Sequence, residues 1–338
     1  MNIANSIQEN SSLSLKLAAI DTYHPSTIRN NQYYLDKFDD TEKLIEIFRK
    51  VGREKRHVIS NSDENSLTMA ISASNNVLKK HNVENGDIDI IIFTSTTLEY
   101  LAPTNALWLH SILGIKNECV CFDINANCLG MFMALEQAAI ILNSNKIYKR
   151  ALVVGSDHMS KIGCETKPIP STIVGDAAAA IILEKTLEKT DSGMMDRIYR
   201  TDSSFKDSIV LPPNGFSQSH TSNNEKIRWG AFSGVESVEF AADALDDLLE
   251  KNQLNLEDIS CFLFSQFTKF NIDLLQEKKN IPWDKIEYIG DQYGYTGANS
   301  LFIAYASRLK KGLIKEGDII LFWTLGAGYQ AGLMLWKV

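Results

Sequence analysis

Residues 119–144 read CVCFDINANCLGMFMALEQAAIILNS, which is a short apolar run, a polar turn and a longer apolar run. The first run is typical of a buried strand, and the second is long enough for a helix. Because that helix is apolar on nearly every face, we expect it to lie in the interior of the protein. Cys128 stands at the turn, where the strand ends and the helix begins.

The strand, turn and helix pattern returns once, in IEYIGDQYGYTGANSLFIAYASRLKKG (286–312). Three further pairs of segments match in the same order: DIDIIIFTS (87–95) with DISCFLFSQ (258–266), RALVVGSDHMS (150–160) with DIILFWTLGAG (318–328), and VGDAAAAIILEK (174–185) with YQAGLMLWKV (329–338). A repeat at about half the chain length indicates two similar halves packed together.

Strands that alternate with helices indicate parallel pairing and helix-covered sheets. We therefore predict an α/β protein with a five-layer α-β-α-β-α arrangement and central helices between two sheets. The halves are predicted to cover residues 15–190, which carry Cys128, and residues 191–338. Residues 1–14 are polar and lack an apolar core, so we expect a flexible tail and no signal peptide.

Composition excludes several classes of partner and site. The net charge of −8 argues against nucleic acid as a binding partner. No stretch approaches the 18 consecutive apolar residues of a membrane span. The five cysteines contain no C-x-x-C pair, so we expect neither a disulfide framework nor a metal site. An odd number of free thiols favours a reducing, cytoplasmic environment.

The position of Cys128 favours a nucleophile. A helix N-terminus offers unpaired N–H groups and partial positive charge, which we expect to lower the pKa of the thiol. The backbone N–H of Cys128 could also form half of an oxyanion hole for a thioester bound to its sulfur. The alternative from position alone is a buried structural cysteine.

The sequence around Cys128 resembles that of the ketoacyl-ACP synthase III enzymes, which have the thiolase fold. FDINANCLGMFMALEQA (122–138) is similar to their active-site stretch. Five further segments resemble family segments, in the same register along the chain: REKRHVIS (53–60), HSILGIKN (110–117), ALVVGSD (151–157), VGDAAAAIILE (174–184) and LGAGYQAG (325–332). The resemblance covers residues 15–338 and implies a thiolase-like fold with an acyl-Cys128 intermediate.

Two members of the family's Cys-His-Asn triad are replaced. FLFSQFTK (262–269) puts Gln266 at the family His position, and GYTGANS (294–300) puts Tyr295 at the family Asn position. Both side chains can donate a hydrogen bond, but the Gln266 amide cannot take a proton near pH 7. We therefore expect decarboxylative condensation to be poor or absent.

Self-acylation of Cys128 has fewer requirements than condensation, namely a thiolate and an oxyanion hole. We expect the N–H of Ala327 to be the second donor of that hole. The predicted function is an acyltransferase that loads Cys128 and passes the acyl group to an amine, hydroxyl or thiol. There are two alternatives: a non-catalytic partner subunit of a heterodimeric synthase, or a ketoacyl synthase with relocated catalytic groups. His158 is the one histidine considered as another base. Asp123, Asp157 and Asp176 are expected to be structural.

The donor is expected to be an acyl-CoA or an acyl carrier protein, with no permanently bound cofactor. The candidate phosphate contacts are Arg49, Lys50, Arg53 and Lys269. The alternative is that these residues form a basic surface that contacts only solvent. KLIEIF (43–48) lacks the Trp that family members stack on adenine, which favours a carrier protein. The resemblance also implies a homodimer, or a heterodimer, formed through the strand at 118–124, with Ala102 on the inserted loop.

Overall fold

The structure is a computed structural model that describes residues 14–163, 167–186, 191–218, 226–230 and 234–338. The expected N-terminal tail therefore lies, up to residue 13, outside the described residues. The segment that joins the two halves falls between β7, which ends at Lys185, and β8, which begins at Gly193.

The first half of the chain builds a five-stranded sheet in the order β1-β7-β6-β4-β5. β4 pairs in parallel with β5 and β6, whereas β7 runs antiparallel to both β1 and β6. The strands are β1 (Leu15–Tyr23), β4 (Ile90–Thr94), β5 (Val120–Ile124), β6 (Arg150–His158) and β7 (Asp176–Lys185).

The second half builds a four-stranded sheet in the order β11-β12-β13-β8. The parallel pair β11–β12 and the antiparallel β13 repeat the arrangement of β4, β6 and β7. The strands are β8 (Gly193–Thr201), β11 (Ile259–Phe264), β12 (Ile319–Gly326) and β13 (Gln330–Lys337). The two halves predicted from the repeat are thus visible as two sheets of matching topology.

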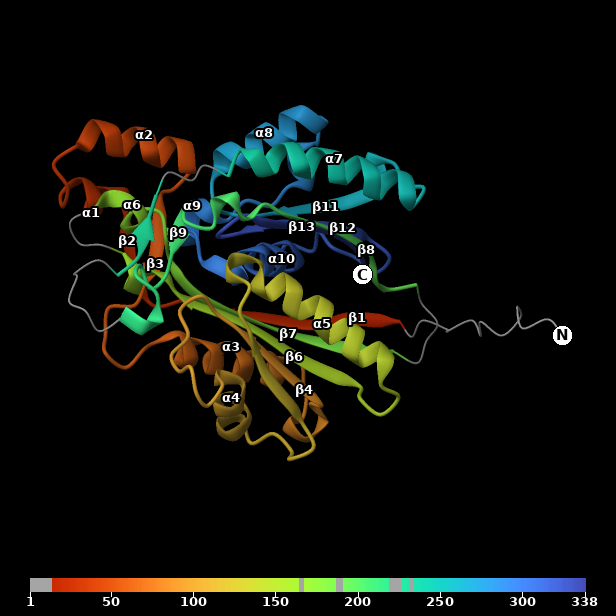
Figure 1. Cartoon of the computed structure of the whole chain (residues 1–338). Coiled ribbons are helices and arrows are strands. Elements are labelled where there is room, and N and C mark those ends of the chain that lie inside the picture. Colours follow the sequence, from red (N-terminus) through yellow and green to blue (C-terminus); the bar gives the residue numbers. More distant parts are fainter. Residues whose placement is uncertain (1–13, 164–166, 187–190, 219–225, 231–233) are drawn as a thin grey trace.

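Helices form three layers around the two sheets, as Figure 1 shows. The layer between the sheets holds α5 (Gly130–Ser144) and α10 (Ser300–Lys310), whose side chains share one apolar core. The outer layers are α3 (Ser66–Lys80) and α4 (Asn105–Leu113) on one side, and α7 (Glu236–Lys251) and α8 (Lys269–Lys279) on the other. The predicted five-layer thiolase-like arrangement is confirmed.

One predicted strand is wrong. The second half has no counterpart of β5, because residues 286–289 make only a single bridge between Ile286 and Phe262. The side-chain amide of Gln266 bonds the backbone here instead: it donates to the Glu287 carbonyl at 3.2 Å and accepts from the Ile289 N–H at 2.9 Å. A side chain thus makes the bonds that a fifth strand would make with its neighbour.

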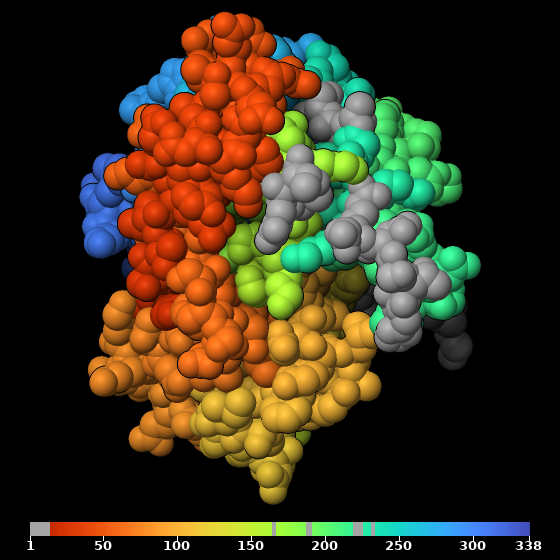
Figure 2. All heavy atoms as spheres, turned by 90° about the vertical axis from the view of Figure 1, so that its left-hand side faces the viewer, coloured from red at the N-terminus to blue at the C-terminus, as the bar shows by residue number. Residues whose placement is uncertain are grey.

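Shorter elements collect at the end of the molecule that carries the site. They are β2 (Thr27–Asn30), α1 (Asn31–Leu35), α2 (Thr41–Val51), β3 (Lys55–Val58), α6 (Pro168–Ser171), β9 (Ile209–Val210), β10 (Arg228–Trp229) and α9 (Gly290–Tyr293). Figure 2 looks onto this end, with the red and orange N-terminal segments beside the yellow-green and teal ones. Among the described residues, none of the helices has the length and apolar character needed to cross a membrane.

Candidate active site

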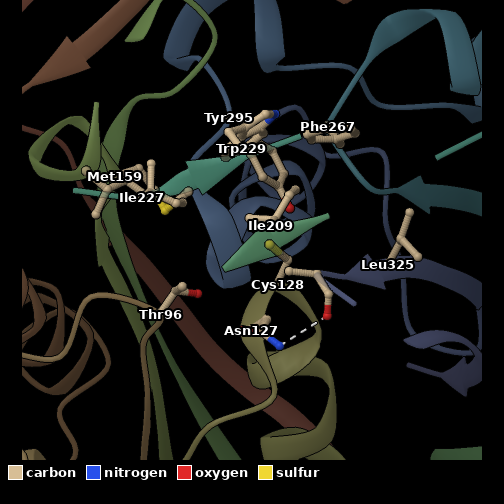
Figure 3. Close-up of a pocket in the computed structure, with 12 residues that line it drawn as sticks. Thr96, Asn127, Cys128, Met159, Ile209, Ile227, Trp229, Phe267, Tyr295 and Leu325 are labelled. Atoms are coloured by element: carbon tan, nitrogen blue, oxygen red, sulfur yellow. Dashed lines mark hydrogen bonds between the residues drawn. The ribbon is translucent and has the colours of Figure 1, made fainter. Parts of the chain in front are cut away.

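A small apolar pocket lies above Cys128, between the two halves of the chain. Its wall is made of aliphatic side chains, namely Met159, Ile162, Ile209, Ile227 and Leu325, with Trp229 and Phe267 on the far side. Figure 3 shows the Cys128 thiol pointing into this space from the start of the central helix, with Tyr295 and Trp229 opposite. An apolar pocket that ends on a sulfur suits the hydrocarbon part of an acyl group.

The chain turns sharply before the central helix. Asn127 has a left-handed backbone (φ 53°) and opens a 3₁₀ turn, Asn127–Leu129, from which α5 continues at Gly130. A Cβ on Gly130 would lie only 2.0 Å from Thr94 Oγ1 at the end of β4, so only glycine allows this close packing. The turn holds the half-buried Cys128 at the floor of the pocket.

The pKa of Cys128 moves in the direction opposite to our expectation. Burial raises it from 9.0 to about 11, while the Tyr295 hydroxyl and the backbone N–H groups of Ala327 and Cys128 lower it only in part. The loss of hydration therefore outweighs the field at the helix start. The same two N–H groups that interact with the sulfur are the pair expected to form the oxyanion hole.

Tyr295 lies opposite the nucleophile. Burial, followed by the neighbouring Cys128, raises the pKa of the phenol well above 10, so the hydroxyl stays protonated and acts as a donor to the sulfur. The Ser265 hydroxyl lies near Tyr295 and lowers this pKa, but it makes no hydrogen bond of ordinary length. The structure thus brings together the side chains of Cys128, Tyr295 and Ser265.

Gln266 does not reach the pocket, so the expectation that it donates into the site is wrong. Its side chain is completely buried and makes four hydrogen bonds to backbone, with Phe264, Glu287, Ile289 and Gly290. Both amide hydrogens and the amide oxygen are used in these bonds. The neighbours of Gln266 turn toward the site instead: Ser265 toward Tyr295, and Phe267 into the pocket wall.

Arg53 is not a surface cation, which corrects its predicted role in phosphate binding. It is 2% exposed, and its guanidinium donates to four carbonyl oxygens and to the Tyr288 hydroxyl. Two of the carbonyls belong to Gln266 and Phe267, at 2.5 and 2.8 Å. Arg53 therefore braces the segment that carries Phe267.

The other three basic candidates are exposed or partly exposed, but they do not share one site. Lys50 lines a surface hollow that adjoins the pocket through Trp229 and Phe267. Arg49 and Lys269 line a separate hollow beside α2. Lys269 is also paired with Asp273 at 2.6 Å and lies 4.6 Å from the centre of the Trp283 ring. Of the four predicted phosphate contacts, Lys50 alone lines a hollow that shares residues with the pocket.

The remaining polar candidates have structural contacts. Asp157 accepts hydrogen bonds from the backbone of Thr96 and Ala298, and Asp176 accepts them from Ile59 and Ser160. Asp123 accepts from the first N–H groups of α4, at Asn105 and Ala106. His158 is outside the pocket lining, and burial lowers its pKa to about 4. A ring of such low basicity that lies outside the pocket lining does not supply a base at Cys128.

Sequence reasoning missed Ser265, Phe267, Trp229 and Asn127. Residues 265–268 form the loop and turn between β11 and α8, so no periodic pattern showed that Ser265 and Phe267 would face the site in place of Gln266. Trp229 lies on the short strand β10, and no sequence pattern linked it to Cys128. Asn127 precedes the nucleophile in the sequence, but its contact is with Ala327, 200 residues away. No sequence pattern predicts a contact over that separation.

Comparisons with known proteins point to one family for both halves of the chain. Two family models match the chain: 3-oxoacyl-[acyl-carrier-protein (ACP)] synthase III over residues 122–203, and the C-terminal model of the same synthase over residues 249–338. The first match begins six residues before Cys128, and the second contains Ser265, Tyr295 and Ala327.

Whole-chain relatives agree with the family models. The β-ketoacyl-[acyl-carrier-protein] synthase III of Koribacter versatilis is 28% identical and covers 95% of this chain and 96% of its own length. Synthase III 2 of Bacteroides thetaiotaomicron is 29% identical, with 95% of each chain covered. The crystal structure of the Aquifex aeolicus synthase III superposes with a TM-score of 0.85 at 24% identity, over 96% of this chain and 100% of that one.

Proposed function

Because the chain belongs to the ketoacyl-ACP synthase III family of thiolase-fold proteins, we propose that it is an acyltransferase that works through an acyl-Cys128 thioester. The observation that carries the proposal is the position of Cys128 at the end of an apolar pocket, beside the Ala327 and Cys128 N–H groups that lower the pKa of its thiol. An oxyanion formed at a carbonyl bound to that sulfur would find both donors in place.

In the first step the Cys128 thiolate attacks the carbonyl carbon of an acyl thioester. The new C–S bond forms, the negative charge moves to the carbonyl oxygen, and the two N–H groups stabilise it. The intermediate collapses when the bond to the donor sulfur breaks. The donor leaves as a thiolate, which takes up a proton equivalent to the one lost by Cys128.

The second step transfers the acyl group to an acceptor. Among the described residues of the pocket lining, none is a base near neutral pH, because the lining has no histidine or carboxylate and Tyr295 stays protonated. A neutral amine can attack a thioester without prior deprotonation, so amines suit this site better than hydroxyls. The same lack of a base argues against decarboxylative condensation by the family's usual route.

The donor is proposed to enter through the hollow that holds Lys50. This hollow shares Trp229 and Phe267 with the pocket above Cys128, and the two rings stack with centroids 6.4 Å apart. A flexible thioester arm could pass these rings while a phosphate stays near Lys50. This geometry supports either an acyl-CoA or an acyl carrier protein as donor.

Association through the edge of the first sheet is also proposed. β5 is the edge strand of the first sheet, and its five residues are half-buried. Several exposed apolar side chains lie on the adjoining loop and on α4: Tyr100, Leu101, Leu107, Trp108 and Ile112. A second copy or a related subunit could pair along this strand and cover these side chains.

The experiment that tests the proposed function is intact-protein mass after incubation with acyl-CoA or acyl carrier protein. We expect an added acyl mass on the wild-type protein and none on Cys128→Ala. The function would be rejected if no donor from acetyl to long-chain acyl left an adduct at pH 7 to 9.

The raised pKa of Cys128 favours one second candidate, a non-catalytic subunit of a heterodimeric synthase. A neutral thiol with no base beside it is a weak nucleophile. This candidate predicts no adduct on the isolated chain with any donor, and a stable complex with a ketosynthase-like partner. The mass measurement above, repeated with and without such a partner, separates the two functions.

A further inference from the structure

We propose that Asn127 is a positioning residue that holds the two oxyanion-hole N–H groups at one point. The inference rests on the proposed function, since it concerns the acyl group on Cys128. Asn127 precedes the nucleophile and lies in the pocket lining. Figure 3 shows the Asn127 side chain beside Cys128 with its hydrogen bond dashed, and the acceptor of this bond is the Ala327 carbonyl oxygen.

The two N–H donors come from distant parts of the chain. One belongs to Cys128 at the start of the central helix, and the other belongs to Ala327 in the turn between β12 and β13. An oxyanion hole needs both donors about 3 Å from one oxygen, so their relative position must be fixed to a fraction of an ångström. A contact between the two segments is therefore required.

The β12–β13 turn is closed internally but needs an external contact to fix its position. Its own hydrogen bond runs from the Tyr329 N–H to the Gly326 carbonyl at 3.1 Å, and Gly328 and Tyr329 both have left-handed backbones. These features set the shape of the turn. They do not set its distance from Cys128.

Asn127 supplies such a contact through its side chain. Its Nδ2 donates to the Ala327 carbonyl oxygen at 3.3 Å, across 200 residues of sequence. Asn127 therefore binds the carbonyl of the same residue, Ala327, whose N–H lowers the pKa of the Cys128 thiol. A second contact, from Thr324 Oγ1 to the Cys128 carbonyl at 3.4 Å, is long and lies further from the donor peptide.

The residue type also fits the backbone. A φ of 53° is disfavoured for most side chains, and asparagine is among the few that adopt it readily. Asparagine thus meets two requirements at once: the left-handed turn that presents Cys128, and a donor that reaches Ala327. Glycine would meet the first and not the second, and aspartate would bring an oxygen toward the Ala327 carbonyl.

The test compares Asn127→Gly and Asn127→Asp with the wild-type protein. Both variants keep the left-handed turn available, so loss of the hydrogen bond is isolated from backbone strain. We expect kcat for acyl transfer to fall about tenfold to a hundredfold, with KM for the donor changed by less than about threefold. Asn82→Gly is the matched control, because Asn82 is exposed in the turn just after the C-terminal end of α3, also has a left-handed backbone (φ 51°), and lies outside the pocket above Cys128.

A spectroscopic readout keeps this proposal separate from the proposed function. An activated aryl thioester with a ¹³C-labelled carbonyl would load Cys128 even if natural donors do not. The infrared carbonyl band of the acyl-enzyme reports the hydrogen bonds to its oxygen. We expect this band at higher wavenumber in Asn127→Gly than in the wild type and in Asn82→Gly. An unchanged band together with unchanged kcat would overturn the role of Asn127, whereas a missing adduct from acyl-CoA and acyl carrier protein alone would overturn only the function.

Discussion

Arg53 Nη2 donates a hydrogen bond to the Phe267 carbonyl oxygen at 2.8 Å, which links the end of α2 to the wall of the Cys128 pocket. The same guanidinium also binds carbonyls of Val51, Ile173 and Gln266. A planar cation with five N–H groups can satisfy several backbone acceptors at once, and no lysine could replace it. The segments around the pocket therefore depend on one buried side chain.

Arg53→Met should destabilise the protein by about 3–5 kcal/mol, since it leaves several buried carbonyl groups without a donor. Chemical denaturation with a tryptophan signal measures this change. Arg49→Met is the control, because Arg49 is exposed in the last turn of α2, four residues before Arg53, and its loss should change the free energy of unfolding by less than about 0.5 kcal/mol. Equal stability of the two variants would contradict the bracing role of Arg53.

The reactivity of Cys128 should rise steeply with pH. Its pKa of about 11 leaves roughly one thiolate in ten thousand at pH 7, so alkylation by iodoacetamide should accelerate about tenfold per pH unit up to pH 10. The rate is measured by mass spectrometry as the difference between wild type and Cys128→Ala, which removes the contribution of other thiols. A rate that levels off near pH 8 would show that the thiol pKa is not raised.

The same shift predicts a sign for stability. The pKa of the folded thiol lies above the value of 9.0 for an unfolded cysteine, so the neutral thiol stabilises the fold below pH 9. Between pH 9 and about 11 the unfolded chain loses this proton first. Stability should therefore fall across that range in the wild type, and less in Cys128→Ala.

Tyr295→Phe should make Cys128 less reactive. The hydroxyl lowers the pKa of the thiol, so its removal should raise that pKa and slow alkylation at pH 9. The effect should be several-fold, the size expected for loss of one hydrogen bond to a charged group. Tyr305→Phe is the matched control, because Tyr305 is equally buried but lies in α10, away from the pocket.

Two double variants test which residue stands at the family His position. Ser265→His with Tyr295→Asn should allow measurable release of ¹⁴CO₂ from labelled malonyl carrier protein, because Ser265 lies beside Tyr295 and an imidazole there would enter the space that the smaller asparagine side chain leaves. Gln266→His with Tyr295→Asn should release no carbon dioxide, since the side chain at position 266 points toward the backbone of residues 287–290. It should also be less stable by several kcal/mol, from the lost backbone bonds. Carbon dioxide release by the second variant alone would reverse this assignment.

Much of the architecture followed from the sequence. The internal repeat and the all-apolar stretch after Cys128 were sufficient to predict two sheets with helices between them, because burial of apolar surface dominates folding. The position of the nucleophile also followed, since a strand, a tight turn and a buried helix fix where Cys128 must lie.

The tertiary structure alone decided what surrounds that sulfur. Only the folded chain shows that Ser265, and not Gln266, lies beside Tyr295, because the Gln266 amide is bound to the backbone of residues 287–290. The pKa of Cys128 depends on how much water the pocket wall removes, and that wall comes from both halves of the chain. Likewise Arg53 looked like a surface cation until the fold brought carbonyls from residues 51, 173, 266 and 267 around it. Local pattern sets the elements, but desolvation and long-range hydrogen bonds exist only once they are packed.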